Sequence, residues 1–349
     1  MALRKLRRQP ARFDSLDLFR QLDTPSGGAI SDPARIEAVF AQIRGPLSQA
    51  LSTESTVQGW RTQALFGSLV VALDGCELLL SVDSGEMFTE GEEIKPPDFL
   101  LVLRDGRRLL VEVKGVPPSK PTGSLRLPAK EMRGLQRFSD LMGIDLFVAG
   151  FLAAFREWVL VPSSAFEVDP SGRYVVDVRR AFQTNEMAAL GDVMLGVVPP
   201  IRLDLLPNES VAHDVAPDGT ARFTIEKAEL RIGGQLMVEK AERRLAMFLL
   251  RFNQWAGREE QEIDGSTIRR LSFVCEPEQR ASGHEFEIVG KLSSMYTRWF
   301  DEATCNDKGE ILALQTSVEP GVLPALLPVD FTSANLPLWR FTLLAQPLK

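Results

Sequence analysis

The sequence predicts an α/β domain, built on a mixed sheet flanked by helices, followed by an α+β domain of unrecognised type. Its 349 residues suggest two domains of about 150 residues each. Between about residues 50 and 165, the hydrophobic periodicity indicates a helix, three strands, a second helix and two more strands. After about residue 190, prolines separate many short strand-like segments. We therefore expect a basic tail at residues 1–30, the first domain at 31–188 and the second at 189–349.

Composition excludes several classes of protein. Hydrophobic residues make up 44% and charged residues 25% of the chain, as in globular proteins, and no apolar run reaches the roughly 20 residues of a membrane span. Three widely spaced cysteines and two histidines argue against a disulfide framework and against a zinc site. We expect a cytoplasmic protein that does not bind membranes. The net charge of -7 argues against indiscriminate coating of nucleic acid, but it leaves room for a local binding site.

The first residues form a basic segment, with Arg4, Lys5, Arg7, Arg8 and Arg12 all preceding the first acidic residue. Because the segment lacks an apolar stretch, it is typical of a solvated tail rather than of a secretory signal. Residues 32–43 then predict a short helix, because Asp32 can cap its start and Pro33 suits the first helical position.

Residues 57–73 predict a buried helix, because they are apolar on nearly every side. Asp74 and Gly75 follow at the point where this helix should end. Residues 76–83 then indicate the first strand of the sheet.

Two strands joined by a turn follow in PPDFLLVLRDGRRLLVEVKG, residues 96–115, and they carry Asp98, Glu112 and Lys114. Because side chains alternate along a strand, Glu112 and Lys114 point to the same face. A two-residue turn would place Asp98 on the other face, whereas a three-residue turn at residues 104–106 sets Asp98 opposite Glu112. Gly106 favours the longer turn, because glycine suits the left-handed position that ends it.

Two carboxylates at a cross-strand distance of about 5 Å repel each other unless a positive group lies between them. A divalent metal ion meets this need, and ligands that are all oxygen suit Mg²⁺ or Mn²⁺. Such an ion activates water and stabilises charge on a phosphoryl oxygen, while Lys114 would orient the water or neutralise the transition state. The pattern therefore indicates phosphodiester hydrolysis. The alternative is a solvated surface hairpin, but the apolar segment 99–103 is typical of a strand covered on both faces.

Pro97-Asp98, a gap of 13 residues and Glu112-Val113-Lys114 together resemble the PD-(D/E)xK nuclease superfamily, which has the restriction-endonuclease-like fold. The resemblance covers roughly residues 50–165. It implies that Asp98, Glu112 and Val113 hold the metal and that Lys114 serves the attacking water. Family members often add a glutamate from the preceding helix.

At the position of that glutamate this sequence has Gln63, and Glu54 lies two turns earlier, so the identity of a further ligand stays open. A loop with Lys120 and a helix at about residues 129–143 come next, and we expect them to contact nucleic acid. Lys130, Arg133 and Arg137 share one helical face, which could equally be a solvated surface. Residues 95–137 contain ten basic and four acidic residues, and this local excess favours contact with phosphates.

Residues 145–152 and 157–166 complete the predicted sheet. In the second domain, residues 236–256 and 290–303 predict helices among the short strands. This domain shows no catalytic set of its own, so we expect it to provide targeting, assembly or regulation, through a homodimer or a partner protein.

These patterns predict an endonuclease that requires Mg²⁺ or Mn²⁺ and cleaves DNA in prokaryotic defence or restriction. The defence role follows only by analogy with the resembled superfamily. The alternative is a non-catalytic nucleic-acid-binding or scaffold subunit of a defence or repair complex. The sequence does not distinguish DNA from RNA.

Overall fold

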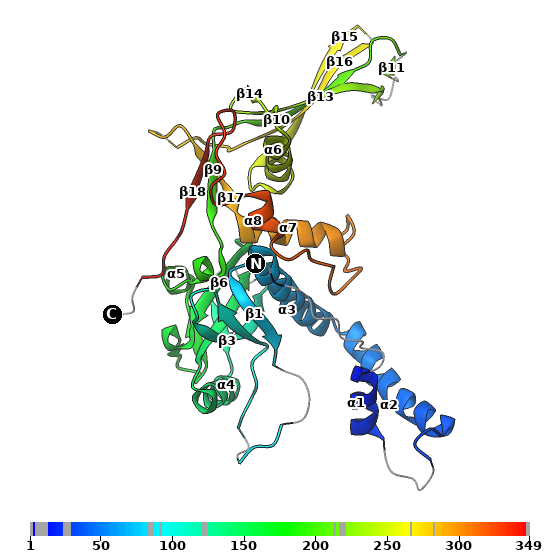
Figure 1. Cartoon of the computed structure of the whole chain (residues 1–349), viewed down its shortest axis with the longest axis vertical. Coiled ribbons are helices and arrows are strands. Elements are labelled where there is room, and N and C mark those ends of the chain that lie inside the picture. Colours follow the sequence, from blue (N-terminus) through cyan, green and yellow to red (C-terminus); the bar gives the residue numbers. More distant parts are fainter. Residues whose placement is uncertain are drawn as a thin grey trace. The chain divides into compact units, whose positions relative to one another are not determined.

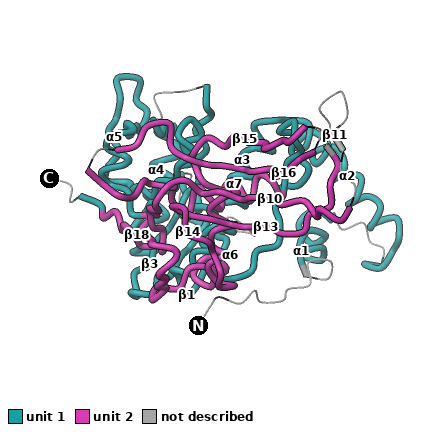
Figure 2. Tube along the Cα trace, turned by 90° about the horizontal axis from the view of Figure 1, so that it is seen from above, with its two compact units in different colours: residues 1–186, 304–320, 345–349 teal, residues 187–303, 321–344 magenta. Residues whose placement is uncertain are grey.

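The computed structural model describes residues 3, 13–23, 29–82, 87–90, 93–119, 124–211, 214–215, 221–265, 267–281 and 283–346. The chain divides into two compact units, coloured separately in Figure 2. Unit 1 comprises residues 1–186, 304–320 and 345–349, and unit 2 comprises residues 187–303 and 321–344. Unit 1 therefore includes two segments that we expected in the second domain. One of them begins at Thr304, whose hydroxyl accepts a buried hydrogen bond of 2.8 Å from Arg61.

In the described part of unit 1, helices α1, α2 and α3 come before the elements of a mixed sheet (Figure 1). Its elements are α1 (Phe13–Leu22), α2 (Pro33–Ser52), α3 (Glu54–Leu73), β1 (Cys76–Ser81), β2 (Phe99–Leu103), β3 (Arg108–Val116), β4 (Leu125–Leu127), α4 (Ala129–Met142), β5 (Asp145–Leu152), β6 (Glu157–Pro162), the 3₁₀ turn η1 (Ser163–Ala165), β7 (Glu167–Val168), β8 (Tyr174–Val176) and α5 (Val178–Gln183).

The main sheet of unit 1 has the order β1-β2-β3-β5-β6. Neighbouring strands run antiparallel except for β3 and β5, which are parallel and are connected through α4. The predicted fold class is confirmed, since a mixed sheet flanked by helices precedes a second unit rich in strands. A smaller sheet, β4-β8-β7, completes unit 1.

Each face of the main sheet has its own core. On one face, Phe66 of α3 packs against Phe99 and Trp158, with ring centroids 6.0 and 5.4 Å away. On the other face, Leu110 of β3 belongs to a buried cluster with Met132 and other apolar residues that include the inner side of α4. The central strand β3 is therefore covered on both sides, and a charge placed on it is largely removed from bulk water.

The hairpin between β2 and β3 has the three-residue turn that the sequence favoured. The amide of Leu103 donates to the carbonyl of Arg107 over 2.8 Å, and the amide of Gly106 donates back to Leu103 over 3.0 Å. Gly106 has a φ of 85°, so the left-handed position is occupied as expected. The ladder then pairs residue 99 with residue 111, and one further step sets Asp98 opposite Glu112.

Several boundaries differ from the prediction. Helix α1 occupies residues 13–22, within the segment that we expected to be a tail, whereas the basic positions 4–12 lie outside the described residues. Helix α2 begins at its Asp32 cap as predicted but runs to residue 52 rather than 43. Pro46 lies inside it at an exposed position. Because proline has no amide proton, the carbonyl oxygen one turn earlier lacks its helical donor, and water can donate to it instead.

The other differences are smaller. Helix α3 is buried mainly in its C-terminal half, and Trp60 nearer its start is 62% exposed. It ends at Asp74, which takes the left-handed conformation without needing Gly75. The last predicted strand stops at Pro162, because residues 163–165 form a 3₁₀ turn instead.

The described part of unit 2 contains antiparallel sheets and the helices α6, α7 and α8, and α7 ends at the unit boundary. Its elements are the 3₁₀ turn η2 (Met187–Leu190), β9 (Met194–Val197), β10 (Ile201–Pro207), β11 (Asp214–Val215), β12 (Ala221–Arg222), β13 (Ile225–Ile232), β14 (Gln235–Leu236), α6 (Lys240–Phe252), β15 (Ala256–Asp264), β16 (Thr267–Glu276), β17 (Glu287–Lys291), α7 (Leu292–Thr304), α8 (Val322–Leu326) and β18 (Leu338–Phe341). The sheet orders are β14-β13-β10-β16-β15, β17-β9-β18 and β11-β12.

Both long helices of unit 2 are fixed by buried carboxylates. Glu242, which is 5% exposed, accepts hydrogen bonds at the start of α6 from the amides of Val238 and Glu239, and also from the Ser333 hydroxyl over 2.6 Å. The carboxylate of Asp192 caps α7 by accepting from the amide and hydroxyl of Ser293 over 2.9 and 2.6 Å. In the described part of the chain, no helix has both the length and the apolarity to cross a bilayer.

Candidate active site

The three charged residues of the hairpin lie together near the start of β2. Asp98 immediately precedes β2, while Glu112 and Lys114 lie on β3 and project from the same face as Leu110. This is the face that α4 covers. Register, strand alternation and the position of α4 therefore bring all three side chains to one region, which we call the hairpin site.

Asp98 bridges the sheet and helix α3. Its Oδ2 atom accepts a hydrogen bond of 2.7 Å from the amide of Val113, and its Oδ1 atom accepts one of 2.9 Å from the Gln63 side chain. Burial and the nearby negative charge of Glu112 raise the pKa of Asp98 to about 6, although the Val113 amide and Lys114 act in the opposite direction. The raised pKa means that loss of the Asp98 proton is unfavourable unless further positive charge enters the site.

Glu112 is the most deeply buried charge of the hairpin site, with 2% of the residue exposed. Its Oε1 atom accepts from the amines of Lys95 and Lys114, over 2.6 and 2.7 Å. Its Oε2 atom is buried and has no hydrogen-bond partner among the residues that the structure describes. A buried carboxylate oxygen without a partner is costly, so this atom marks a position where a cation or a water would be favourable.

Two residues of the hairpin site, Lys95 and Glu131, were not predicted as functional. Lys95 lies in the segment before β2, and Glu131 lies in the first turn of α4. The Oε1 atom of Glu131 accepts from Lys95 over 2.5 Å and from Lys114 over 2.9 Å. Together with Glu112 and Lys114, they form an alternating ring of two carboxylates and two amines.

This ring controls the charge of its members. Burial disfavours the charged amine of Lys114, but the carboxylates of Glu112 and Glu131 outweigh it, so the pKa of Lys114 lies above its usual value. The pKa of Lys95 is raised in the same way. Glu131 has a lowered pKa, because the two lysines outweigh the effect of its burial. Both lysines are therefore ammonium groups at neutral pH.

The approach of Lys95 depends on a glycine of α4. The amide of Lys95 donates a hydrogen bond of 3.1 Å to the carbonyl of Gly134, and a Cβ atom at position 134 would lie 3.1 Å from both the Cβ and N atoms of Lys95. Glycine therefore allows the segment before β2 to lie directly on α4. This contact delivers the Lys95 amine to Glu112.

A sequence signal for Glu131 was present. Glu131 precedes Gly134, Leu135 and Phe138 by three, four and seven residues, which places it on the inward side of a helix. A carboxylate on that side, next to a strand with buried charges, is a candidate partner for them. For Lys95 no comparable pattern exists, because it lies in an irregular segment.

The hairpin site fits a divalent metal ion in part. Among the described residues, no group of three or more histidine, cysteine, aspartate or glutamate side chains is placed to hold a metal. Asp98 and Glu112 supply two carboxylates, and the free Oε2 atom of Glu112 offers an unused ligand position. Mg²⁺ usually keeps several waters and takes only one or two protein carboxylates, so this donor set is sufficient for it.

The remaining predicted residues lie elsewhere. Glu54 is exposed in the first turn of α3, nine residues or about 13 Å along the helix from Gln63. Lys130, Arg133 and Arg137 are exposed on one face of α4, where Arg133 contacts Glu93 over 3.3 Å. Lys120 lies outside the described residues. Gln63 is thus the α3 residue that reaches the hairpin site.

Comparison with known proteins places the chain in no established family. No family model matches it, and no curated protein does. Among solved structures, it is similar to Hjc, a Holliday junction resolvase from the archaeal hyperthermophile Archaeoglobus fulgidus, with 22% sequence identity over 32% of this chain and 84% of that chain. The TM-score is 0.26. A score this low establishes no common fold, and the similarity carries no inference about activity.

Proposed function

We propose that this chain is a metal-dependent nuclease of the PD-(D/E)xK type that hydrolyses phosphodiester bonds in DNA. The observation that carries the proposal is the buried Oε2 atom of Glu112, which has no partner in the described part of the chain and lies next to a carboxyl group whose pKa is raised to about 6. Keeping two carboxyl groups buried and incompletely compensated costs folding free energy, and a bound cation would remove this cost.

Asp98 and Glu112 would hold the ion, with the backbone of Val113 as the third contact from the chain. When bound, Mg²⁺ or Mn²⁺ lowers the pKa of a water and stabilises negative charge on a phosphoryl oxygen. Gln63 holds Asp98 in place through its 2.9 Å hydrogen bond and leaves the second lone pair of Oδ1 available.

Lys114 acts as a hydrogen-bond donor rather than as a general base. Its pKa is raised by Glu112 and Glu131, so it carries no free lone pair at neutral pH. It can orient the attacking water or neutralise the charge that develops on the phosphate. Lys95, held by the same two carboxylates, keeps Glu131 compensated when Lys114 turns toward a substrate.

The test is a cleavage assay on supercoiled plasmid, linear DNA and RNA, with Mg²⁺, with Mn²⁺ and with a chelator. We expect cleavage of DNA that requires the ion and that is abolished in Glu112→Gln, a change that preserves shape but removes the charge. Cleavage that survives chelation, or that is equal in the variant, would refute the proposal.

A second function has one observation in its favour. The ring of Lys95, Lys114, Glu112 and Glu131 is closed and electrically balanced, which is also what a purely structural ion cluster requires. In that case the chain is a nucleic-acid-binding or scaffold subunit. Metal titration of the wild type by calorimetry separates the two, because a structural cluster takes up no ion.

The biological part of the proposal is a role in prokaryotic defence. It rests on the pairing of a compact nuclease-like unit with a second unit of different architecture. Phage plating on cells that express the wild type or Glu112→Gln tests it, and equal plaque numbers would count against it.

A further inference from the structure

Cations on the five-stranded sheet of unit 2 are paired with acids. Every described lysine and arginine on that sheet forms a salt bridge, namely Arg202, Lys227, Arg231, Arg258, Arg269 and Arg270. Their positive charges are therefore compensated locally, as expected for a protein of net charge -7.

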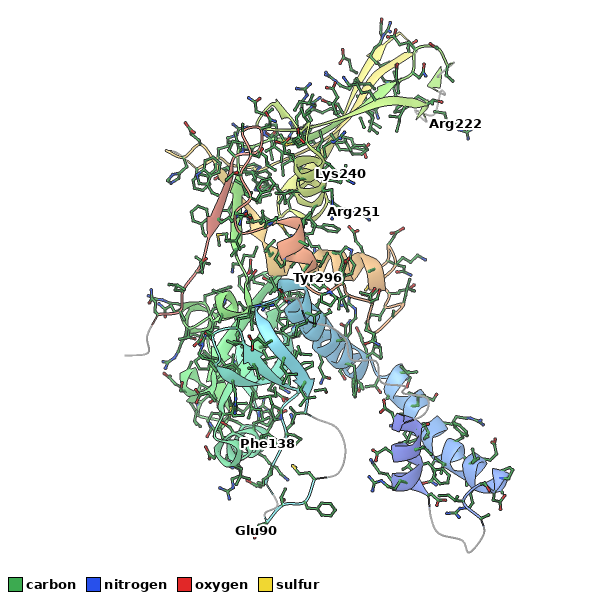
Figure 3. All side chains as sticks on the ribbon, viewed as in Figure 1. Glu90, Phe138, Arg222, Lys240, Arg251 and Tyr296 are labelled. Atoms are coloured by element: carbon green, nitrogen blue, oxygen red, sulfur yellow. The ribbon has the colours of Figure 1, made fainter. Side chains whose placement is uncertain are left out.

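Helix α6 of the same unit differs. Lys240, Arg243 and Arg244 are exposed, and none of them has an acidic partner among the residues that the structure describes. They occupy positions i, i+3 and i+4 and so share one helical face. Arg251 lies near the other end of the helix (Figure 3), and its pairing with Glu302 over 2.7 Å compensates its charge.

The basic face is unfavourable for the helix itself. Lys240 is the first residue of α6, where the helix dipole disfavours positive charge. Its neighbours at i+3 and i+4 carry the same charge and repel it. Neither nearby acid forms a salt bridge with them, because the Glu239 side chain accepts from the backbone of the helix start and the buried Glu242 carboxylate is turned to the Val238 and Glu239 amides and to Ser333. An anionic ligand would relieve all of these interactions.

The surface beside these cations is hollow. A depression of about 560 Å³ is lined by Lys240, Arg243, Arg244, Met247, Phe248 and Leu326. Three of these six lining residues are cations and the other three are apolar. A nucleic-acid strand matches this combination, since its phosphates can meet the cations while a sugar or base covers the apolar side chains.

We propose that this face of α6 binds the sugar–phosphate backbone of a nucleic acid and gives unit 2 a substrate-holding role. Two of its three cations are arginines, which donate to phosphate in a bidentate manner. The choice of nucleic acid as the ligand rests on the proposed nuclease function of unit 1. The face lies in unit 2, whereas the described residues of the hairpin site belong to unit 1.

The experiment measures binding of the full chain to a short fluorescein-labelled DNA duplex by anisotropy, without metal, between about 50 and 200 mM salt. The test variant is Lys240→Gln/Arg243→Gln/Arg244→Gln. The matched control is Arg258→Gln/Arg269→Gln/Arg270→Gln, which removes the same charge from paired positions of unit 2. A third variant, Lys240→Arg/Arg243→Lys/Arg244→Lys, keeps the charge and checks that the helix still folds.

We expect the test variant to weaken binding more than about tenfold and to lower the slope of log Kd against log salt by about 2 to 3, because up to three phosphate contacts are lost. The control and the charge-preserving variant should bind within about threefold of the wild type. The melting temperature of the test variant should be equal to or above that of the wild type, because repulsion is removed.

Equal affinities and salt slopes for the wild type and the test variant would overturn the inference. So would a test variant that keeps its DNA affinity but loses binding to vesicles containing phosphatidylserine. The outcome is separable from the proposed function, because binding is measured without cleavage. If the wild type cleaves DNA but the test variant binds DNA as well as the wild type does, only the α6 inference fails. If the wild type does not cleave DNA but the test variant loses binding, only the nuclease proposal fails.

Discussion

The Nζ atom of Lys114 lies 2.9 Å from Oε1 of Glu131, a carboxylate that comes from a helix rather than from the hairpin. The amine is thus shared between a strand neighbour and a helix residue. Its charge and its freedom to reach a substrate depend on both, so the hairpin motif alone does not set the properties of the site.

Changing Asp98→Asn should weaken metal binding and cleavage together, because it removes a negative charge from the expected ion position. It should also alter how stability depends on pH. The folded pKa of Asp98 is raised to about 6, so the stability linked to its neutral form is present at low pH and is lost as pH rises through about 6.

Without metal, the variant should therefore melt at the wild-type temperature near pH 4 and above it near pH 8. The free energy of unfolding near pH 8 should rise by about 1 to 3 kcal/mol, since one unit of pKa shift corresponds to about 1.4 kcal/mol. Scanning calorimetry across this range measures it. A variant that is less stable than the wild type near pH 8 would show that the Asp98 charge is already compensated.

Under the proposed function, changing Lys114→Ala should lower cleavage by about 10² to 10⁴ while the metal still binds, because the residue would position a reacting group and would supply no ligand. Lys95→Ala is the matched control, since Lys95 contacts the same two carboxylates as Lys114. We expect the effect of this substitution on cleavage to be much smaller. Single-turnover cleavage beside calorimetric metal titration separates chemistry from binding. Equal losses in the two variants would mean that Lys114 only balances charge.

The ring also changes what we expect for stability. From the hairpin alone, loss of Lys114 should leave the melting temperature unchanged or raise it. Because Lys114 contacts both Glu112 and Glu131, we expect the Ala variant to melt at a lower temperature, with a free energy of unfolding about 1 to 2 kcal/mol below that of the wild type. Lys95 still compensates part of the charge of the two carboxylates. Thermal melts without metal measure this difference.

Changing Glu131→Gln should lower the pKa of Lys114, because one of the two carboxylates that raise it is removed. The alkaline limb of the pH–rate profile, where the ammonium group is lost, should move to lower pH. Glu93→Gln is the control, because Glu93 is exposed and contacts Arg133 rather than a lysine of the ring. An unchanged alkaline limb in the Glu131 variant would indicate that loss of the Lys114 proton does not cause that limb.

Changing Gly134→Ala should destabilise unit 1 by about 1 to 3 kcal/mol, because the new methyl group meets the Lys95 backbone at 3.1 Å. Gly59→Ala is the matched control in helix α3, where a Cβ atom would meet nothing within 4 Å. It should stabilise by about 0.5 to 1 kcal/mol through helix propensity. Thermal melts compare the two, and the same sign of change at both positions would contradict the contact.

The sequence by itself determined the elements of the first sheet and the register of its hairpin. Both depend on local rules. Alternation places Glu112 and Lys114 on one face, and a glycine at position 106 selects a three-residue turn, which brings Asp98 opposite Glu112. These rules act within about twenty residues and need no knowledge of the rest of the chain.

Only the tertiary structure decided which groups surround that hairpin. Glu131 and Lys95 reach Glu112 because α4 lies on the sheet and Gly134 lets the preceding segment approach it closely. Gln63 of α3 reaches Asp98 at the point where β2 begins, which brings a residue 35 positions earlier in the chain to the hairpin site. Residues 304–320 join unit 1 through a contact with Arg61 that spans most of the chain. Such contacts arise from packing between elements distant in sequence, and periodicity along the chain carries no record of them.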